Sequence, residues 1–153
     1  MATPEQGLAR YLERVRGVAT RSEWWALFSD LCADLPSMPG KGLPKPSSLA
    51  DNPACCICNN LVIEYRRDMH QHWGDPNASL RLGLTQARTR HPDTPLAALA
   101  TNGVAFHVYT ADFDESGHVV ELRPADGLNL ASPMMTPQRA VDEISGLLKR
   151  WMK

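Results

Sequence analysis

Residues 61–66 (Leu-Val-Ile-Glu-Tyr-Arg) place a carboxylate and a guanidinium two positions apart at the end of an apolar run. The β-branched and aromatic residues predict a strand, and alternate residues of a strand project from the same face. Glu64 and Arg66 are therefore expected to share a face. A charged pair on an otherwise buried strand costs free energy unless something uses it, so this pair is the first candidate for chemistry. From these residues alone, a solvated ion pair with no function stays open as the other interpretation.

Cysteines precede this run, and two of them have the spacing of half a zinc site. Cys55 and Cys58 form a C-x2-C pair, and His70 and His72 follow, but no second C-x2-C pair is present. The three cysteines from 55 to 58 lie in an expected strand, whose neighbouring side chains point to opposite faces. The chain begins without a secretory signal pattern, so we expect reduced, buried thiols, Cys32 included.

Length and composition predict a single globular domain. The chain has 153 residues, enough for one domain with a core, and 43% of them are hydrophobic. No apolar run approaches the roughly 18–20 residues of a membrane span, which together with the N-terminus predicts a cytoplasmic protein. The net charge of −1 neither indicates nor excludes nucleic acid, because binding can use a local patch.

Elements alternate along the chain in a way that predicts an α/β or α+β fold, with helices flanking a central mixed sheet. The expected units are N-terminal helices within 1–34, a sheet core at 53–123 and a C-terminal helix at 136–152. Capping residues at Thr3, Thr20, Asn77 and Thr136 are expected to begin the four helices. The expected strands are a hairpin over 54–66 turning at Asn59-Asn60, two strands joined at Asn102-Gly103, and a strand at 118–123. Residues 35–50, 67–76 and 124–135 are expected to be loops.

Three features in order now resemble a known family. A strand ends in Glu64-Tyr65-Arg66, a following helix carries Gln86, and Thr101-Asn102-Gly103 comes later. This set is similar to the PD-(D/E)xK nuclease superfamily, above all to the N-terminal nuclease domain of type I restriction endonuclease subunits and of methylase-fused restriction proteins. The resemblance covers roughly residues 53–110. It implies a restriction-endonuclease-like core, Mg²⁺ (or Mn²⁺) as cofactor, and DNA cleavage in defence against foreign DNA.

The resemblance also implies roles for single residues. Glu64 matches the family's metal-binding glutamate, Arg66 stands where the family has lysine, and Gln86 would orient the site. Arg90 occupies the position of the motif's tyrosine. Ala54 follows Pro53 where the family has its metal-binding aspartate, so catalysis is expected to be impaired, and Asp51 is the nearby substitute we consider as a metal ligand. Ala54 belongs either to a natural degenerate nuclease or to one in which an aspartate was replaced.

Basic residues around these motifs are candidates for contacts with the DNA backbone. The segment from Asn77 to His91 contains no acid, so a helix there would present a basic surface. The candidates are Lys41, Lys45, Arg67, Arg88 and Arg90. The alternative function is a catalytically inactive module that binds DNA or a partner such as a methyltransferase or translocase subunit; the sequence does not indicate an oligomeric state.

The register of the expected hairpin distinguishes between these interpretations. With a two-residue turn at Asn59-Asn60, Cys55 lies opposite Glu64; with a three-residue loop, Ala54 does. The family resemblance predicts the three-residue loop, because the residue at position 54 and Glu64 must then meet at one metal.

Overall fold

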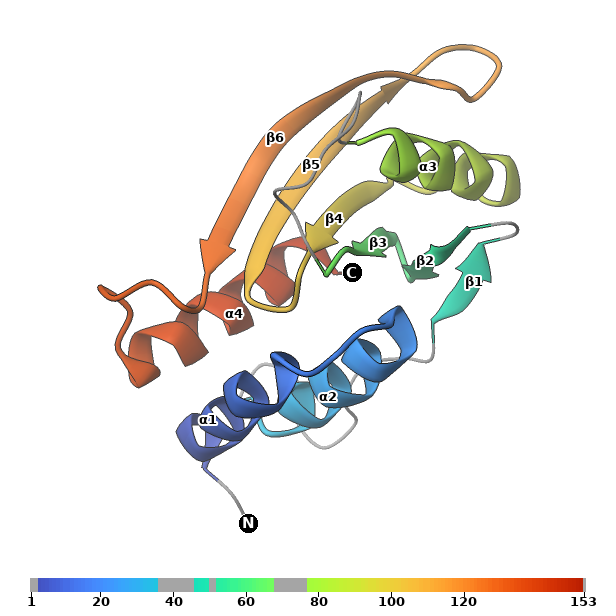
Figure 1. The fold of residues 1–153 in the computed structure, drawn as a ribbon. Coiled ribbons are helices and arrows are strands. Elements are labelled where there is room, and N and C mark those ends of the chain that lie inside the picture. Colours follow the sequence, from blue (N-terminus) through green and yellow to red (C-terminus); the bar gives the residue numbers. More distant parts are fainter. Residues whose placement is uncertain (1–2, 36–45, 50–51, 68–76, 153) are drawn as a thin grey trace.

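A six-stranded mixed sheet forms the centre of the protein (Figure 1). The structure is a computed structural model that describes residues 3–35, 46–49, 52–67 and 77–152. The strands lie side by side in their sequence order, and only the β3–β4 pair is parallel. The strands are β1 (Ser47–Leu49), β2 (Asn52–Cys58), β3 (Leu61–Tyr65), β4 (Ala97–Thr101), β5 (Ala105–Phe113) and β6 (Val119–Asn129).

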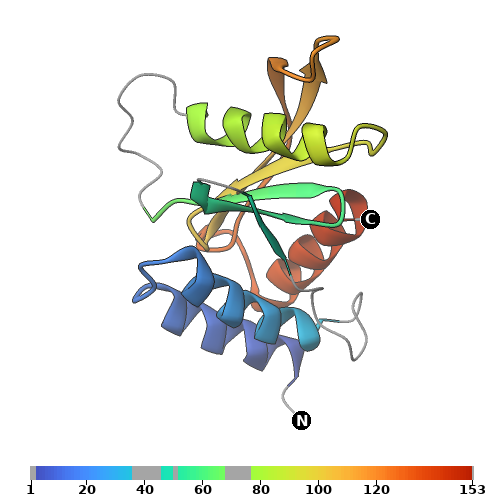
Figure 2. The same cartoon turned by 90° about the vertical axis from the view of Figure 1, so that its right-hand side faces the viewer.

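Helices cover both faces of the sheet, so the expected α+β class is confirmed (Figure 2). Helices α1 (Pro4–Val15), α2 (Arg21–Ala33) and α4 (Pro137–Trp151) pack on one face, and α3 (Ala78–Arg90) packs on the other. Because α3 is the crossover between the parallel strands β3 and β4, its first turn lies near the carboxyl end of β3.

Three of the four expected helix starts are confirmed by their capping contacts. The hydroxyls of Thr3, Thr20 and Thr136 accept hydrogen bonds from backbone N–H groups three residues later. Asn77 does precede α3, but its side chain makes no capping hydrogen bond, so the expected cap there is wrong. Among the described residues, no helix is long and apolar enough to cross a membrane.

Aromatic side chains fill the larger core, between the sheet and helices α1, α2 and α4. Trp24 is fully buried and stacks on both Phe28 and Tyr65. Its indole N–H donates to the hydroxyl of Tyr11 over 2.9 Å. The tryptophan pair Trp24-Trp25 therefore packs in the core, as expected, and offers no stacking surface to a nucleic acid.

Two segments that the sequence predicted to be loops include β-strands in the structure. Within 35–50, residues Ser47–Leu49 form β1 and pair with β2. Within 124–135, β6 continues through Pro124 as far as Asn129. Pro124 fits this strand because β6 is the last strand of the sheet, and an edge strand tolerates a residue that lacks an N–H donor.

The β2–β3 hairpin has the two-residue turn, so the register predicted from the family resemblance is wrong. Cys58 pairs with Leu61, and Cys55 pairs with Glu64. Asn59 has a φ of 56°, the left-handed conformation that asparagine tolerates in such a tight turn. The cross-strand neighbour of Glu64 is therefore Cys55 and not Ala54.

Candidate functional site

Glu64 and Arg66 lie at the carboxyl ends of the two parallel strands, beside the first turn of α3. Glu64 is the second-last residue of β3 and pairs with Ala100 of β4. Arg66 follows β3 directly, and its backbone N–H donates to the carbonyl of Thr101 over 2.8 Å.

The two charged side chains form an ion pair, as their shared face predicts. Arg66 Nε lies 2.7 Å from Glu64 Oε1, with the Glu64 side chain fully buried and the Arg66 side chain 20% exposed. The Nε–H group is not aligned for a hydrogen bond with that oxygen. Arg66 therefore balances the charge of the buried carboxylate.

Cys55 occupies the position across from Glu64. Its Sγ donates to Glu64 Oε2 over 3.8 Å, and it also lies 3.8 Å from the carbonyl oxygen and 3.9 Å from the hydroxyl of Ser79. A Cβ added to Gly83 would come within 3.3 Å of the sulfur, so glycine lets α3 approach the strand closely. Glu64, Cys55 and Ser79 thus meet under the first turn of α3.

The other cysteines belong to the opposite face of the sheet. Cys56 and Cys58 pack in the core with Cys32 of α2, whereas Cys55 packs beneath α3. Burial raises the pKa of the Cys32 and Cys56 thiols, and raises the pKa of Cys58 to about 11, so these thiols stay protonated. All four cysteines are buried, as expected, and none forms a disulfide. The C-x2-C pair cannot chelate one ion because its side chains point to opposite faces of the sheet.

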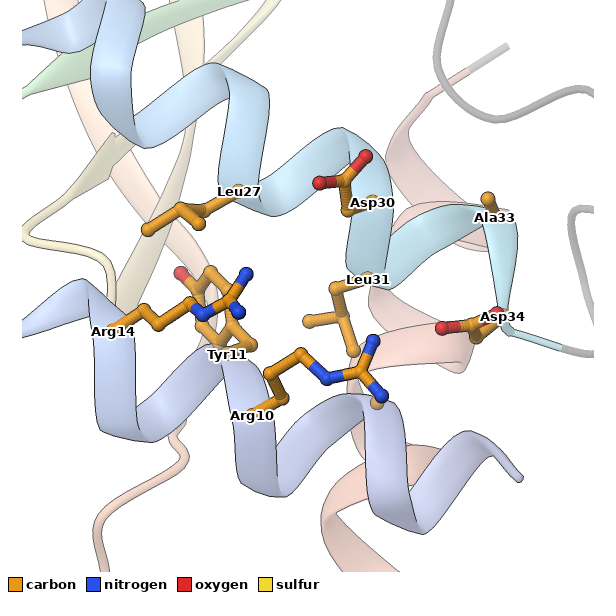
Figure 3. Close-up of a pocket in the computed structure, with 9 residues that line it drawn as sticks. Arg10, Tyr11, Arg14, Leu27, Asp30, Leu31, Ala33 and Asp34 are labelled. Atoms are coloured by element: carbon orange, nitrogen blue, oxygen red, sulfur yellow. The ribbon is translucent and has the colours of Figure 1, made fainter. Parts of the chain in front are cut away.

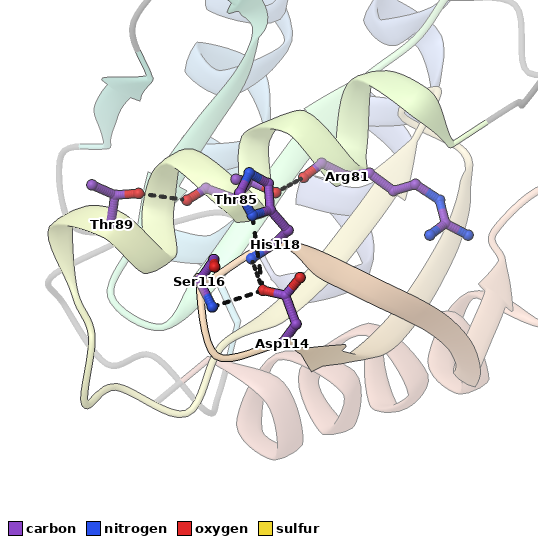
Figure 4. Close-up of polar contacts among 6 residues, drawn as sticks. All are labelled: Arg81, Thr85, Thr89, Asp114, Ser116 and His118. Carbon is purple, nitrogen blue, oxygen red and sulfur yellow. Dashed lines mark hydrogen bonds and ion pairs between the residues drawn. The ribbon is translucent and has the colours of Figure 1, made fainter.

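The remaining predicted residues of α3 lie towards its other end. Gln86 is seven residues beyond Ser79, which places it about 10 Å further along the helix axis. Figure 4 follows α3 from Arg81 to Thr89, where the hydroxyls of Thr85 and Thr89 each donate to a carbonyl one turn earlier. The structure therefore separates Gln86, and with it Arg88 and Arg90 of the last turn, from the Glu64 end of the helix.

Arg88 has structural partners. Its Nη1 donates to the carbonyls of Pro92 over 2.8 Å and Thr94 over 3.0 Å, and its guanidinium lies 4.3 Å from the centre of the Phe113 ring. These contacts fasten the loop after α3 and the β5–β6 ribbon to the helix. The guanidinium is thereby occupied within the protein.

The Thr101-Asn102-Gly103 sequence forms a self-contained turn. The Thr101 hydroxyl accepts from the Gly103 N–H and donates to the Ala105 carbonyl, and Asn102 Oδ1 accepts from two backbone N–H groups. Gly103 has a φ of 93° and contacts α1, where the Tyr11 hydroxyl donates to its carbonyl. Local geometry and packing against α1 therefore explain these residue types without any catalytic role.

A separate hollow of about 290 Å³ lies between α1 and α2 (Figure 3). Arg10 and Arg14 line it from α1, and Asp30 and Asp34 line it from α2. None of the predicted site residues borders it. In the described parts of the chain, no three His, Cys, Asp or Glu side chains are grouped so that they could hold a metal ion.

Lys41, Lys45 and Asp51, together with His70 and His72, lie outside the described residues. Arg67 is exposed beside Arg66. The sequence did not single out Ser79, and it placed Cys55 opposite Glu64 only for the two-residue turn at Asn59-Asn60, which is the turn that the structure has. No family model, no curated protein and no solved structure matches this chain.

Proposed function

We propose that this chain is a restriction-endonuclease-like domain that binds the sugar–phosphate backbone of foreign DNA in the cytoplasm. The observation that carries the proposal is the placement of Glu64 and Arg66 on one face at the end of β3, beside the first turn of α3. The order of elements also matches the order implied by the family resemblance, whereas the register of the hairpin does not. The β2–β3 hairpin is followed by α3 with Gln86, and then by the Thr101-Asn102-Gly103 turn.

In this proposal Arg66 is the main contact with a phosphate. An arginine guanidinium is always charged and its planar fork fits phosphate oxygens, but it serves poorly as a base. Arg67, exposed next to it, extends the positive surface. Contacts of this kind hold DNA in place without reading its sequence.

Cleavage with Mg²⁺ or Mn²⁺ is expected to be weak. Magnesium prefers several oxygen ligands, and Glu64 faces a thiol where a second carboxylate would be needed. Arg66 also balances the charge of Glu64, and it would have to move before a hard cation could bind there. We therefore propose a domain that retains the DNA site of a nuclease and lacks an efficient Mg²⁺ site.

The test is retention of double-stranded DNA by the wild-type chain, an Arg66→Ala variant and an Arg139→Ala variant over a series of salt concentrations. Arg139 is the matched control, because it is exposed on α4 and pairs only loosely with Glu143 at 3.8 Å. Loss of one phosphate contact should lower affinity and reduce the slope of log K against log salt by about 0.9. The control should retain the wild-type slope.

Equal slopes for both variants would remove Arg66 from the binding surface. No retention of DNA by the wild-type chain at low salt would overturn the proposal. That result would favour the alternative, in which the domain binds a methyltransferase or translocase subunit.

A further inference from the structure

The thiol of Cys55, the carboxylate of Glu64 and the oxygens of Ser79 meet beneath α3. We propose that these three residues form a site for a thiophilic divalent cation of the Zn²⁺ class. The ability to bind rests on the contacts among these residues, whereas any role of the ion in acting on DNA rests on the proposed function.

The separation of the donor atoms fits one shared ion. Cys55 Sγ and Glu64 Oε2 are 3.8 Å apart. Zinc bonds to sulfur at about 2.3 Å and to carboxylate oxygen at about 2.0–2.2 Å, so a single ion can touch both atoms. Ser79 lies 3.8–3.9 Å from the same sulfur through its carbonyl and hydroxyl oxygens, and either can be the third donor. Catalytic zinc sites have three protein donors and one open position, and those donors are His, Cys, Asp or Glu, so the Ser79 oxygen is the weakest of the three donors here.

The chemistry of the donors determines which cation is preferred. Thiolate is a soft ligand that favours zinc and similar metals, whereas magnesium favours oxygen. With Cys55 across from Glu64, the site at the end of β3 therefore selects against Mg²⁺. A carboxylate at position 55 would instead favour a hard cation such as Mg²⁺.

Charge balance links this cation to Arg66. In its absence, Arg66 compensates the buried Glu64 carboxylate. When the ion binds, the Cys55 thiol releases one proton to solvent, and thiolate and carboxylate together neutralise the two positive charges. Arg66 is then no longer needed as the counter-ion of Glu64.

Arg66 also competes with a cation for Glu64. Cys55 is 1% exposed and Glu64 is fully buried, and the Arg66 side chain that pairs with Glu64 is 20% exposed. Arg66 Nε lies 2.7 Å from Glu64 Oε1. Cation and guanidinium therefore compete for Glu64.

The experiment is a Cd²⁺ titration of the full chain, followed by the ultraviolet thiolate-to-metal charge-transfer band, with Zn²⁺ and Mg²⁺ as competitors. We expect one band that Zn²⁺ removes and Mg²⁺ does not. Cys55→Ser should abolish it. Cys58→Ser, a buried thiol on the opposite face, is the matched control and should keep it. Thermal unfolding establishes that each variant is folded.

Two further variants test the other partners. Glu64→Gln should weaken Cd²⁺ binding at least about tenfold through loss of a ligand. Arg66→Ala should tighten it, because the competing counter-ion is gone. No band in the folded wild-type chain, or equal loss of the band in the Cys55 and Cys58 variants, would overturn the site. Because DNA is absent from this titration, failure of the DNA proposal and failure of the cation site can be told apart.

Discussion

Cys55 Sγ lies 3.8 Å from Glu64 Oε2 across the β2–β3 ladder. In the proposed cation site, this contact makes Cys55 the residue that decides which cation can bind beside Glu64. In the wild-type chain, that residue supplies a sulfur.

A first prediction concerns the residue that would support Mg²⁺-dependent cleavage. Cys55→Asp places a second carboxylate across from Glu64, and we expect it to raise plasmid nicking with Mg²⁺ or Mn²⁺ at least about tenfold above the wild-type level. Ala54→Asp should leave nicking at the wild-type level, because residue 54 is not the cross-strand neighbour of Glu64. Nicking is read from agarose gels after each variant is shown to be folded.

The opposite outcome has a clear meaning. Cleavage by the Ala54→Asp variant alone would place residue 54 opposite Glu64 in solution and contradict the two-residue turn at Asn59-Asn60.

Arg88 should matter for stability and not for DNA. Arg88→Ala removes two short hydrogen bonds to the carbonyls of Pro92 and Thr94 and the contact with Phe113. We expect the free energy of unfolding to fall by about 2 kcal/mol, measured by urea denaturation. The salt dependence of DNA retention should not change, and a reduced slope in this variant would show that Arg88 contacts phosphate after all.

Gly103 should tolerate no side chain. Its φ is 93°, and a Cβ built there would lie 2.5 Å from Val15 Cγ2. The left-handed backbone conformation and the steric overlap should together lower the free energy of unfolding of the Gly103→Ala variant by about 2–4 kcal/mol.

The control for this variant is Gly17→Ala. A Cβ at Gly17 would lie 3.8 Å from the nearest atom, the Arg14 carbonyl oxygen, and the residue is exposed. Its unfolding free energy should stay within about 0.5 kcal/mol of wild type. Similar losses in both variants would contradict the packing of α1 on the Gly103 turn.

Asp126 should make stability depend on pH in the acid range. Burial raises its pKa, but hydrogen bonds from the Trp151 indole, Arg150 and the Gly127 N–H outweigh this, so the pKa is lowered in the folded state. A carboxylate with a lowered folded pKa contributes stability above its unfolded pKa of about 3.9, and loses that contribution as pH falls through the folded value.

The check is urea unfolding of wild type and Asp126→Asn between pH 7 and pH 2.5. We expect the variant to be about 1–2 kcal/mol less stable at pH 7, with the difference shrinking as the pH falls below 4. A difference that is constant with pH would mean that the Asp126 charge does not hold α4 to β6.

Local chemistry determined much of this fold from the sequence. Thr3, Thr20 and Thr136 begin helices because their hydroxyls satisfy N–H groups within one turn. Glu64 and Arg66 share a face because strands alternate. Each of these predictions depends on neighbours within a few residues, and each is confirmed.

The tertiary structure decided what lies opposite Glu64. A shift of one residue in the hairpin exchanges Ala54 for Cys55, and the residue types allow both turns, so only the packing of β2 against α3 and the core selects the register. Tertiary contacts likewise extend β6 through Pro124 and hold the Gly103 turn against α1. They also pair the Arg88 guanidinium with the carbonyl of Pro92. The sequence determined that a charged pair ends β3, and the pairing of strands determined that its neighbour is a thiol.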